Sequence, residues 1–596
     1  MANFVLCIDE NPDRRRAFIE AVRPRLALFP DLITGTISSG DLDAAWAAAP
    51  RAPIAHVADA DGASLIMGEI IGAGGERLTP AALRELWREP VLDTASAGFD
   101  GYHAACVYRG RRLLVGADRL GLFPVYYYES PGVLLVGSSP EAFRAHPSFR
   151  TAFNPTGLVG ILLTNGLFDG ETLLAGVRRL SAGHLLGWEP GAPARELPGY
   201  RPALSDRYLD LSFASHLDIL DAAMADAIRR HVRPDGSCSL FLSGGLDSRT
   251  LGGYLKAAGR EAVALTLGVR DDIEVQCAIP VARALGLRQH VRELAPTRYP
   301  EFARLHTTWE HCAAGSSLVM QWGMPDLLDD LPLPYVSGLG LDWVLGGHAP
   351  TEPGLSFDMF FRYQNAWGLA PALLDTLLRK DVFADVLAAT MKRIEATYTG
   401  YSDVESRRAW SFSLYHRQRF HIGSEAWRLT FAGWPAVLAA DRALLEIGGS
   451  LPPATAADRR AQLELLRTRF PELAELPLDR NSADTTPIQP GLRWLLSRRF
   501  RRPLQRLQGK LELAPGGRRL ERRRYYRIFD INNAGWMALR REAETSRELA
   551  YAFFEKPALD RLLPPPDVRI VSREGIADVA GIKTVIGFML WAKAHL

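Results

Sequence analysis

The stretch Cys238-Ser239-Leu240-Phe241-Leu242-Ser243-Gly244-Gly245-Leu246-Asp247-Ser248-Arg249 is the part of the sequence that decides the fold. Its apolar run ends at Ser243-Gly244-Gly245, and the residues that follow Arg249 favour a helix. A buried strand therefore leads through a glycine turn to a helix N-terminus, where free backbone N–H groups and the helix dipole bind anions. Ser243 and Ser248 add hydroxyl donors, and the Asp247 carboxylate is suited to hold Mg2+ beside phosphate oxygens. The stretch predicts a phosphate site rather than an ordinary strand–turn–helix corner.

This loop resembles the Ser-Gly-Gly-x-Asp-Ser pyrophosphate loop of the ATP pyrophosphatase family, whose members activate a substrate as an adenylate and release pyrophosphate. It differs from the phosphate loop of kinases and GTPases, because no Gly-Lys-Ser/Thr follows it. The resemblance implies that ATP and Mg2+ take part in the reaction. It also implies ATP and pyrophosphate contacts from Leu242, Ser243, Gly244, Gly245, Asp247 and Ser248.

A second motif follows about a hundred residues later, in Ser337-Gly338-Leu339-Gly340-Leu341-Asp342 and the glycines Gly346-Gly347. It resembles the family's Ser-Gly-x-Gly-x-Asp-x-x-x-Gly-Gly motif, in which glycines let the backbone approach a ligand closely. The resemblance implies nucleotide contacts from Ser337 and Gly338, and a metal site formed by Asp247 and Asp342. Such a metal neutralises phosphoryl charge while the α-phosphorus is attacked. Leu267-Gly268 resembles the strand end that contacts adenine through its backbone.

Length and composition bound the class of protein. A chain of 596 residues is too long for one core, so at least two domains are expected. An apolar fraction of 47%, a charged fraction of 23% and a net charge of +2 give no general reason to expect nucleic acid. The five cysteines have no paired spacing, which indicates neither disulfides nor zinc and fits a reducing compartment. With no signal peptide and no apolar run of ~18–20 residues, we expect a soluble cytoplasmic protein without membrane contact.

The first domain, residues 1–205, is expected to form packed antiparallel sheets of the Ntn-hydrolase type. Strand-like segments alternate with turns there, and the run from Arg112 to Tyr127 resembles the "RDxxGxxPLYY" hairpin of the glutaminase domain in asparagine synthetases. That glutaminase needs Cys as the first residue after Met removal. This chain starts Met1-Ala2-Asn3, and Cys7 lies inside the first strand, where a small buried hydrophobe is expected. The sequence therefore predicts an inactive glutaminase-like domain, retained for structure or for partner docking.

The second domain, residues 206–596, alternates strands with helices, which predicts a parallel sheet of the adenine-nucleotide hydrolase-like type with helical insertions. The predicted fold class is thus α/β plus α+β. Ser424-Glu425-Ala426 resembles a helical region of the family in which Glu425 is the candidate general base toward an amine; a helix-capping or salt-bridging carboxylate is the alternative. The family's transition-state lysine has no direct match. Arg480 is the nearest cation and Lys583 a distant second choice.

Leu339 helps to distinguish among the reactions that the resemblance implies. Asparagine synthetases carry Glu at this motif position and β-lactam synthetases carry Tyr. A leucine side chain provides neither acid–base chemistry nor a hydrogen bond, which counts against both activities. With the lost glutaminase chemistry and the length, the chain most resembles the lasso peptide cyclases. These adenylate an Asp or Glu side chain of a leader-cleaved peptide and close a macrolactam with its N-terminal amine, an effectively intramolecular attack. The resemblance implies a peptide substrate, and a leader peptidase or other biosynthetic proteins as partners.

Two other functions stay open at this point: a small-molecule amide ligase such as a β-lactam-synthetase-like enzyme, and a non-catalytic ATP-binding docking scaffold. The inserted segments 350–410 and 490–550 are candidates to line a cavity wide enough for a peptide. Residues 493–527 carry 13 Lys and Arg against two Glu. A solvated face or a partner-docking segment is favoured there over nucleic-acid binding.

Overall fold

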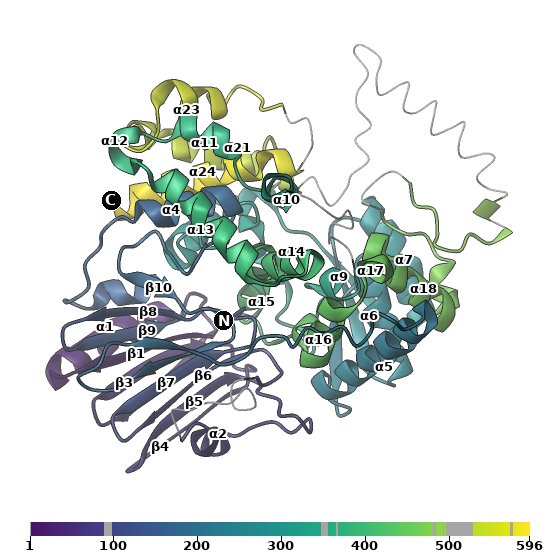
Figure 1. Cartoon of the computed structure of the whole chain (residues 1–596), viewed down its shortest axis with the longest axis horizontal. Coiled ribbons are helices and arrows are strands. Elements are labelled where there is room, and N and C mark those ends of the chain that lie inside the picture. The colour runs from purple at the N-terminus through teal and green to yellow at the C-terminus, as the bar shows by residue number, and fades with distance from the viewer. Residues whose placement is uncertain are drawn as a thin grey trace.

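The computed structural model describes residues 2–88, 98–346, 356–364, 367–480, 484–492, 494–495, 528–571 and 576–596. Two antiparallel sheets form its N-terminal part, and a parallel sheet with many helices forms the rest (Figure 1). No helix in these ranges is both long enough and apolar enough to span a membrane. The basic segment 493–527 lies outside the described residues except for 494–495.

The N-terminal sheets have six strands each, and both are antiparallel throughout. The first sheet has the order β10-β8-β9-β1-β3-β2, with β1 (Asn3–Asp9), β2 (Ile33–Ser39), β3 (Leu42–Ala48), β8 (Tyr126–Ser130), β9 (Val133–Gly137) and β10 (Val177–Arg179). The second has the order β12-β11-β7-β6-β5-β4, with β4 (Ile54–Asp59), β5 (Gly62–Gly68), β6 (His103–Arg109), β7 (Arg112–Ala117), β11 (His184–Trp188) and β12 (Arg195–Pro198).

The central strands of this sandwich are buried on both faces. Every residue of β1, β3 and β5 is buried, because α1 (Pro12–Leu26) packs on the first sheet and α2 (Pro80–Leu86) on the second. Asn11 starts α1 by accepting hydrogen bonds from two backbone N–H groups of its first turn. The result is the packed antiparallel architecture predicted from the sequence.

The hairpin motif after β7 has a structural explanation. The Asp118 carboxylate accepts hydrogen bonds from the backbone N–H groups of Leu120, Leu122 and Phe123, at 3.2, 3.1 and 2.7 Å. Gly121 has φ +60°, and a Cβ there would lie 2.8 Å from a guanidinium nitrogen of Arg419. Arg419 also donates to the carbonyl of Leu180 at 2.5 Å. An arginine from the C-terminal part therefore fills the interface at this turn.

The parallel sheet has the order β15-β14-β13-β16-β17. Its strands are β13 (Ser237–Phe241), β14 (Glu261–Leu267), β15 (Arg288–Arg292), β16 (Tyr335–Val336) and β17 (Pro435–Ala436). Helices α6 (Leu246–Ala257) and α7 (Ile273–Leu285) connect the first three strands. Since β13 pairs in parallel with both β14 and β16, the loops that follow these strands emerge at one edge, where ligands of such sheets bind. Together the three sheets confirm the predicted fold class.

The remaining helices surround the parallel sheet and reach back to the sandwich. Those used below are α4 (Pro155–Thr164), α5 (Phe213–His231), α15 (Ser424–Leu429), α18 (Arg460–Arg469), α21 (Ala534–Glu544), α24 (Ile576–His595) and the π-helices η3 (His306–Glu310) and η6 (Leu414–Ile422). The Thr584 hydroxyl of α24 donates to Asn165, the C-cap of α4, at 2.8 Å. Figure 1 shows the C-terminal end beside α4, so the chain's last helix packs against its first domain. The boundary proposed at residue 205 falls between β12 and α5.

Candidate functional site

The loop after β13 is closed by its own serines. Ser243 donates its backbone N–H to the Ser248 hydroxyl at 3.0 Å, and that hydroxyl donates to the Ser243 carbonyl at 3.1 Å. Leu242 makes a last ladder bond, from its N–H to the Leu265 carbonyl at 2.8 Å. Gly245, the N-cap of α6, has no side-chain capping bond within the described chain. The first N–H groups of α6 are therefore directed at a position suited to an anion.

Two glycines allow this loop to pack closely against its neighbours. A Cβ on Gly244 would lie 2.4 Å from the Cys277 Cβ and 2.9 Å from the Glu274 carbonyl oxygen. A Cβ on Gly338 would lie 2.8 Å from the Asp247 Cβ. Only glycine avoids these overlaps, so the two sequence motifs are in direct contact.

Asp247 and Asp342 meet at a third side chain, Arg459. Its Nη1 atom lies 3.0 and 3.2 Å from the two Asp247 carboxylate oxygens, and its Nη2 atom lies 3.7 Å from Asp342 Oδ2. Gln462 Nε2 also donates to Asp247, at 2.8 Å. Burial raises the pKa of Asp247 and so does the Asp342 charge, while Arg459 lowers it. The structure thus brings together the two carboxylates predicted as a metal site.

These carboxylates fit a divalent cation. A guanidinium already lies between them, which shows that the position attracts positive charge, and carboxylate oxygens are the ligands that Mg2+ takes in proteins. The side chains are 26% exposed for Asp247 and 18% for Asp342, so an ion can reach them from solvent. Arg459 was missed in the sequence because the stretch Ala457-Asp458-Arg459-Arg460 carries no motif.

Leu267 and Gly268 lie at the same edge of the sheet. Leu267 ends β14, and Gly268, with φ +129°, donates its N–H to the Arg292 carbonyl at 2.8 Å. A Cβ on Gly268 would lie 2.6 Å from an Asp272 oxygen. Ser337 follows β16 directly, so these three candidates border the loop of Ser243 on both sides.

Glu425 ends a buried polar network. Gln321 donates its amide to Glu425 at 2.6 Å and accepts from Arg428 at 2.5 Å. Arg428 in turn forms a bidentate pair with Glu310, at 2.6 and 2.7 Å. Burial raises the pKa of Glu425 to about 7, although the Arg428 charge opposes this shift. Within the described residues Glu425 has no salt-bridge partner, and a carboxyl group with this pKa is suited to accept a proton near neutral pH.

The π-helix η6 connects Glu425 to the second motif. A Cβ on Gly340 would lie 4.0 Å from Gln418 Oε1, a buried oxygen without a hydrogen bond to any described group. Gln418 belongs to η6, and α15 with Glu425 follows that helix after Gly423. π-Helical turns are frequent at functional sites. An unsatisfied acceptor and the candidate base therefore come from one continuous helical segment.

The two candidate cations have different surroundings. Asp479 donates its N–H to the Gly244 carbonyl at 3.0 Å, which places the segment of Arg480 against the loop. Arg480 itself is exposed and donates to the Thr486 carbonyl at 3.2 Å. Lys583 is buried in α24, 4.7 Å from the Trp536 ring centroid, and burial lowers its pKa to about 7. Lys583 belongs to the packing between α24 and α21 and is not brought to the loop.

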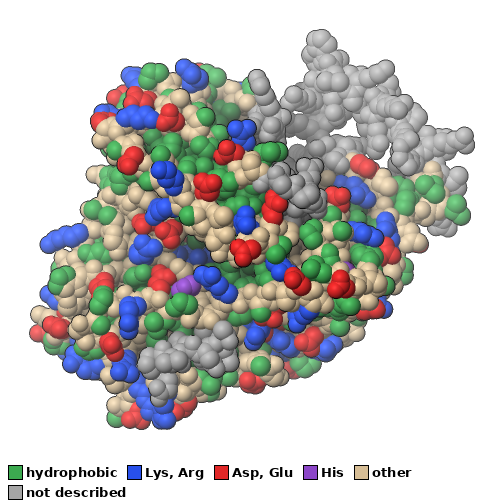
Figure 2. All heavy atoms as spheres, viewed as in Figure 1, with side chains coloured by type: hydrophobic (Ala, Val, Ile, Leu, Met, Phe, Trp, Pro, Cys, Tyr) green, Lys and Arg blue, Asp and Glu red, His purple; other side chains and the backbone are tan. Residues whose placement is uncertain are grey.

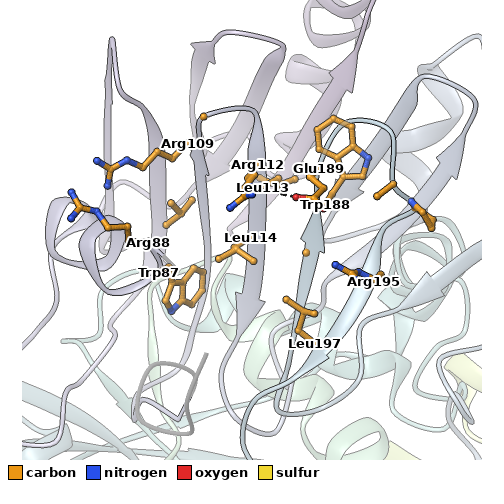
Figure 3. Close-up of a pocket in the computed structure, with 15 residues that line it drawn as sticks. Trp87, Arg88, Arg109, Arg112, Leu113, Leu114, Trp188, Glu189, Arg195 and Leu197 are labelled. Carbon is orange, nitrogen blue, oxygen red and sulfur yellow. Dashed lines mark ion pairs between the residues drawn. The ribbon is translucent and has the colours of Figure 1, made fainter. Parts of the chain in front are cut away.

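Two hollows lie apart from the aspartate pair. One, of about 430 Å³, lies on the outer face of the second sheet, where Figure 3 shows Trp87, Trp188 and several arginines around Leu113 and Leu114. The other, of about 360 Å³, lies between the domains and is lined by residues that include Phe168, Ser181, His184, Tyr401, Tyr415 and Arg419. Figure 2 shows the surface hollowed near the middle of one face, with charges of both signs around it.

The N-terminal sandwich offers no reactive thiol. The five cysteines of the chain, Cys7, Cys106, Cys238, Cys277 and Cys312, are all buried. Burial raises the pKa of each thiol, to about 12 for the last four and further for Cys7. A nucleophilic cysteine needs the opposite shift. The prediction that Cys7 is a buried core residue is confirmed.

We expect the native protein to react with no equivalents of a thiol reagent such as dithionitrobenzoate within minutes, because protonated and buried thiols are inert. All five cysteines should react after denaturation. Absorbance titration in buffer and in guanidinium chloride gives the two counts. A fast-reacting thiol in the native protein, lost in Cys7→Ala, would contradict an inactive glutaminase-like domain.

The comparisons with known proteins agree with this geometry. The asparagine synthase family matches residues 220–546, and the glutamine amidotransferase domain matches residues 87–196. Asparagine synthetase [glutamine-hydrolyzing] 3 of Bacillus subtilis is 30% identical over 175 residues, which cover 28% of this chain and 26% of that protein. Carboxyethyl-arginine beta-lactam-synthase of Streptomyces clavuligerus is 25% identical over 257 residues, which cover 42% of this chain and 47% of that protein. These matches span less than half the length of either relative, whereas the family match covers more than half of this chain. The chain belongs to the asparagine synthase family.

Proposed function

We propose that the protein is an ATP-dependent, AMP-forming amide ligase that cyclises a peptide. It adenylates an Asp or Glu side chain and joins it to the peptide's own N-terminal amine, as lasso peptide cyclases do. One observation carries the nucleotide part of this proposal: two loops at one sheet edge bring Asp247 and Asp342 to a shared cation beside the open N-terminus of α6.

Adenylation requires held phosphates and neutralised charge. The α6 N-terminus and the Ser243–Ser248 loop would bind the phosphate oxygens of ATP, and Asp247 with Asp342 would hold Mg2+ there. That ion supplies charge neutralisation when bound. The substrate carboxylate attacks the α-phosphorus, the bond from that phosphorus to the bridging oxygen breaks, and pyrophosphate leaves with the electron pair. This step forms an acyl adenylate.

Amide formation then requires a base. The amine attacks the carbonyl carbon of the acyl adenylate, AMP leaves with the electron pair of the broken carbon–oxygen bond, and the amine proton passes to Glu425. A carboxyl group with a pKa of about 7 is ionised to a useful fraction at neutral pH and still binds the proton it receives. Gln321, hydrogen-bonded to both Glu425 and Arg428, holds the carboxylate in place.

Three features favour an amine that comes from the substrate itself. The five thiols are buried, which disfavours release of ammonia from glutamine by a cysteine of this chain. The Leu339 side chain is partly buried against the core and offers no polar group to a small amino acid. The interdomain cavity adjoins η6, which lines it with Tyr415 and Arg419 and meets Gly340 through Gln418. Such a cavity, of about 360 Å³, gives room to a few residues of a peptide.

We also propose a partner-docking role for the N-terminal domain. The hollow on the second sheet combines two tryptophans with Arg88, Arg109, Arg112 and Arg195, opposed by Glu189, which pairs with Arg112 at 3.3 Å. Aromatic and arginine side chains dominate the energetics of protein interfaces. A leader peptidase or another biosynthetic protein is the expected partner.

A small-molecule amide ligase is the second candidate, favoured by the similarity to carboxyethyl-arginine beta-lactam-synthase. A non-catalytic ATP-binding scaffold is the third, and it gives no reason for two carboxylates to converge on one cation.

ATP–pyrophosphate exchange tests these functions against one another. The purified protein is incubated with labelled pyrophosphate, ATP, Mg2+ and linear peptides that carry a free N-terminus and an internal Asp or Glu. We expect exchange that depends on the peptide, and a product lighter than the peptide by one water. Exchange with aspartate alone would contradict peptide cyclisation, exchange with a small β-amino acid would favour the second candidate, and no exchange with any substrate would favour the scaffold.

A further inference from the structure

Arg459 holds an unusual position for a residue outside both motifs. Its guanidinium contacts Asp247 through Nη1 at 3.0 Å and Asp342 through Nη2 at 3.7 Å. The side chain is 25% exposed, so it borders solvent. Burial lowers the pKa of Arg459, but the two carboxylates raise it, and the group stays fully charged. Two carboxyl groups and one guanidinium therefore lie in contact.

The backbone is held in an unfavourable conformation to bring Arg459 there. Asp458 has φ 52° and ψ 27°, and Arg459 has φ 60° and ψ 28°, so two successive non-glycine residues are left-handed just before α18. Side chains other than glycine avoid this region unless the surroundings impose it. The residues just before them are held in place, since Thr455 hydrogen-bonds His216 at 2.8 Å and Ala456 packs where a Cβ on Gly346 would lie. Residues in such conformations cluster at ligand sites.

Mg2+ and this guanidinium compete for the same carboxylate oxygens. A magnesium ion binds carboxylate oxygens at about 2.0–2.1 Å, and a like charge at hydrogen-bond distance from the same oxygens is repelled from it. When the ion enters, Arg459 must leave at least one carboxylate. The nearest new anion is then the pyrophosphate part of ATP at the N-terminus of α6, whose oxygens match the planar fork of arginine.

We propose that Arg459 also binds the pyrophosphate group of ATP, beside the Ser243–Ser248 loop, after serving as counter-ion to Asp247 and Asp342 in the empty site. This inference rests on the proposed nucleotide site. The neighbouring arginines are engaged differently: Arg460 lies 4.0 Å from the Phe213 ring centroid, and Arg480 donates to Thr486.

The test compares Arg459→Gln and Arg459→Lys with Arg460→Gln as the matched control at the next residue, the first of α18. Two binding measurements are made on the full chain. Mn2+ without nucleotide is titrated by electron paramagnetic resonance, and α,β-methylene-ATP with Mg2+ is titrated by calorimetry. The analogue cannot release pyrophosphate, so neither readout depends on turnover.

We expect Arg459→Gln to bind free Mn2+ at least tenfold more tightly than the wild type, because the competing cation is gone. The same variant should bind the magnesium nucleotide at least tenfold more weakly, because the phosphate contact is gone. Arg459→Lys should recover part of the nucleotide affinity, and Arg460→Gln should match the wild type in both titrations.

Unchanged nucleotide affinity in Arg459→Gln would overturn the inference while leaving the proposed function in place, and so would an equal loss in Arg460→Gln. Weaker Mn2+ binding in Arg459→Gln would also overturn it, since Arg459 would then be needed to position the carboxylates. A wild-type protein that binds neither ligand would instead overturn the proposed function itself.

Discussion

Replacing Asp247 with Asn should abolish ATP–pyrophosphate exchange, with a fall of about 10³-fold or more. The change removes a negative charge and keeps the shape, so it tests the charge itself. Asp247 is one of two carboxylates that share the cation at the α6 N-terminus, and loss of one charge-stabilising group in an active site costs about 10²–10³ in rate. Loss of the bound ion adds to this cost. Exchange of labelled pyrophosphate into ATP measures the effect.

Two controls accompany this variant. Asp342→Asn should show the same loss, because both carboxylates contact Arg459. Asp226→Asn removes a carboxylate that pairs with Arg229 on the exposed side of α5, and it should keep wild-type exchange. All three variants should retain the wild-type circular dichroism spectrum. Exchange within tenfold of the wild type in Asp247→Asn would remove this residue from the metal site.

Glu425→Gln should separate the two halves of the reaction. We expect amide formation to fall about 10²–10⁴-fold, the usual contribution of a positioned base, while pyrophosphate exchange stays within a few-fold of the wild type. Exchange reports adenylation, in which Glu425 has no part, and mass spectrometry of the cyclised product reports the second step. Glu301→Gln, on an exposed ion pair with Arg298, serves as the control. Equal losses in both steps would contradict a role as base.

The assignment of Glu425 as the base also predicts the direction in which the rate changes with pH. A base acts in its ionised form, and burial raises the pKa of Glu425 to about 7. The wild-type rate of amide formation should therefore be level above about pH 8 and fall about tenfold per pH unit below pH 7. In Glu425→Gln this dependence should be absent from the residual rate.

The same shift predicts a stability change. A carboxyl group whose pKa is higher in the folded chain favours folding when protonated, and this contribution is lost as the pH rises through the folded-state pKa of about 7. A glutamine side chain does not titrate, so it makes no such pH-dependent contribution to stability. In urea titrations, the free energy of unfolding of Glu425→Gln minus that of the wild type should thus be larger at pH 8 than at pH 5. The variant is then relatively more stable at the higher pH.

The sequence by itself determined the features that are written in contiguous residues. Ser243-Gly244-Gly245 after an apolar run specifies a strand, a turn and a helix N-terminus, because the turn needs glycine and the helix end needs a ligand for its N–H groups. The alternation of strands and helices specified a parallel sheet, and the position of Cys7 within an apolar strand specified a buried thiol. Periodicity and local backbone preference suffice for such statements.

Only the tertiary structure decided which distant side chains meet. Arg459 is 212 positions from Asp247 and belongs to no motif, so nothing local indicates that its guanidinium lies between two carboxylates. The raised pKa of Glu425 likewise depends on burial, which the charge of Arg428 opposes, and the hydrogen bond from Gln321 joins residues 104 positions apart. Lys583 looked like a possible cation in sequence, yet packing beside Trp536 places it in the core. Long-range contacts arise when whole elements dock, and the charge balance of a site follows from that docking rather than from neighbouring residues.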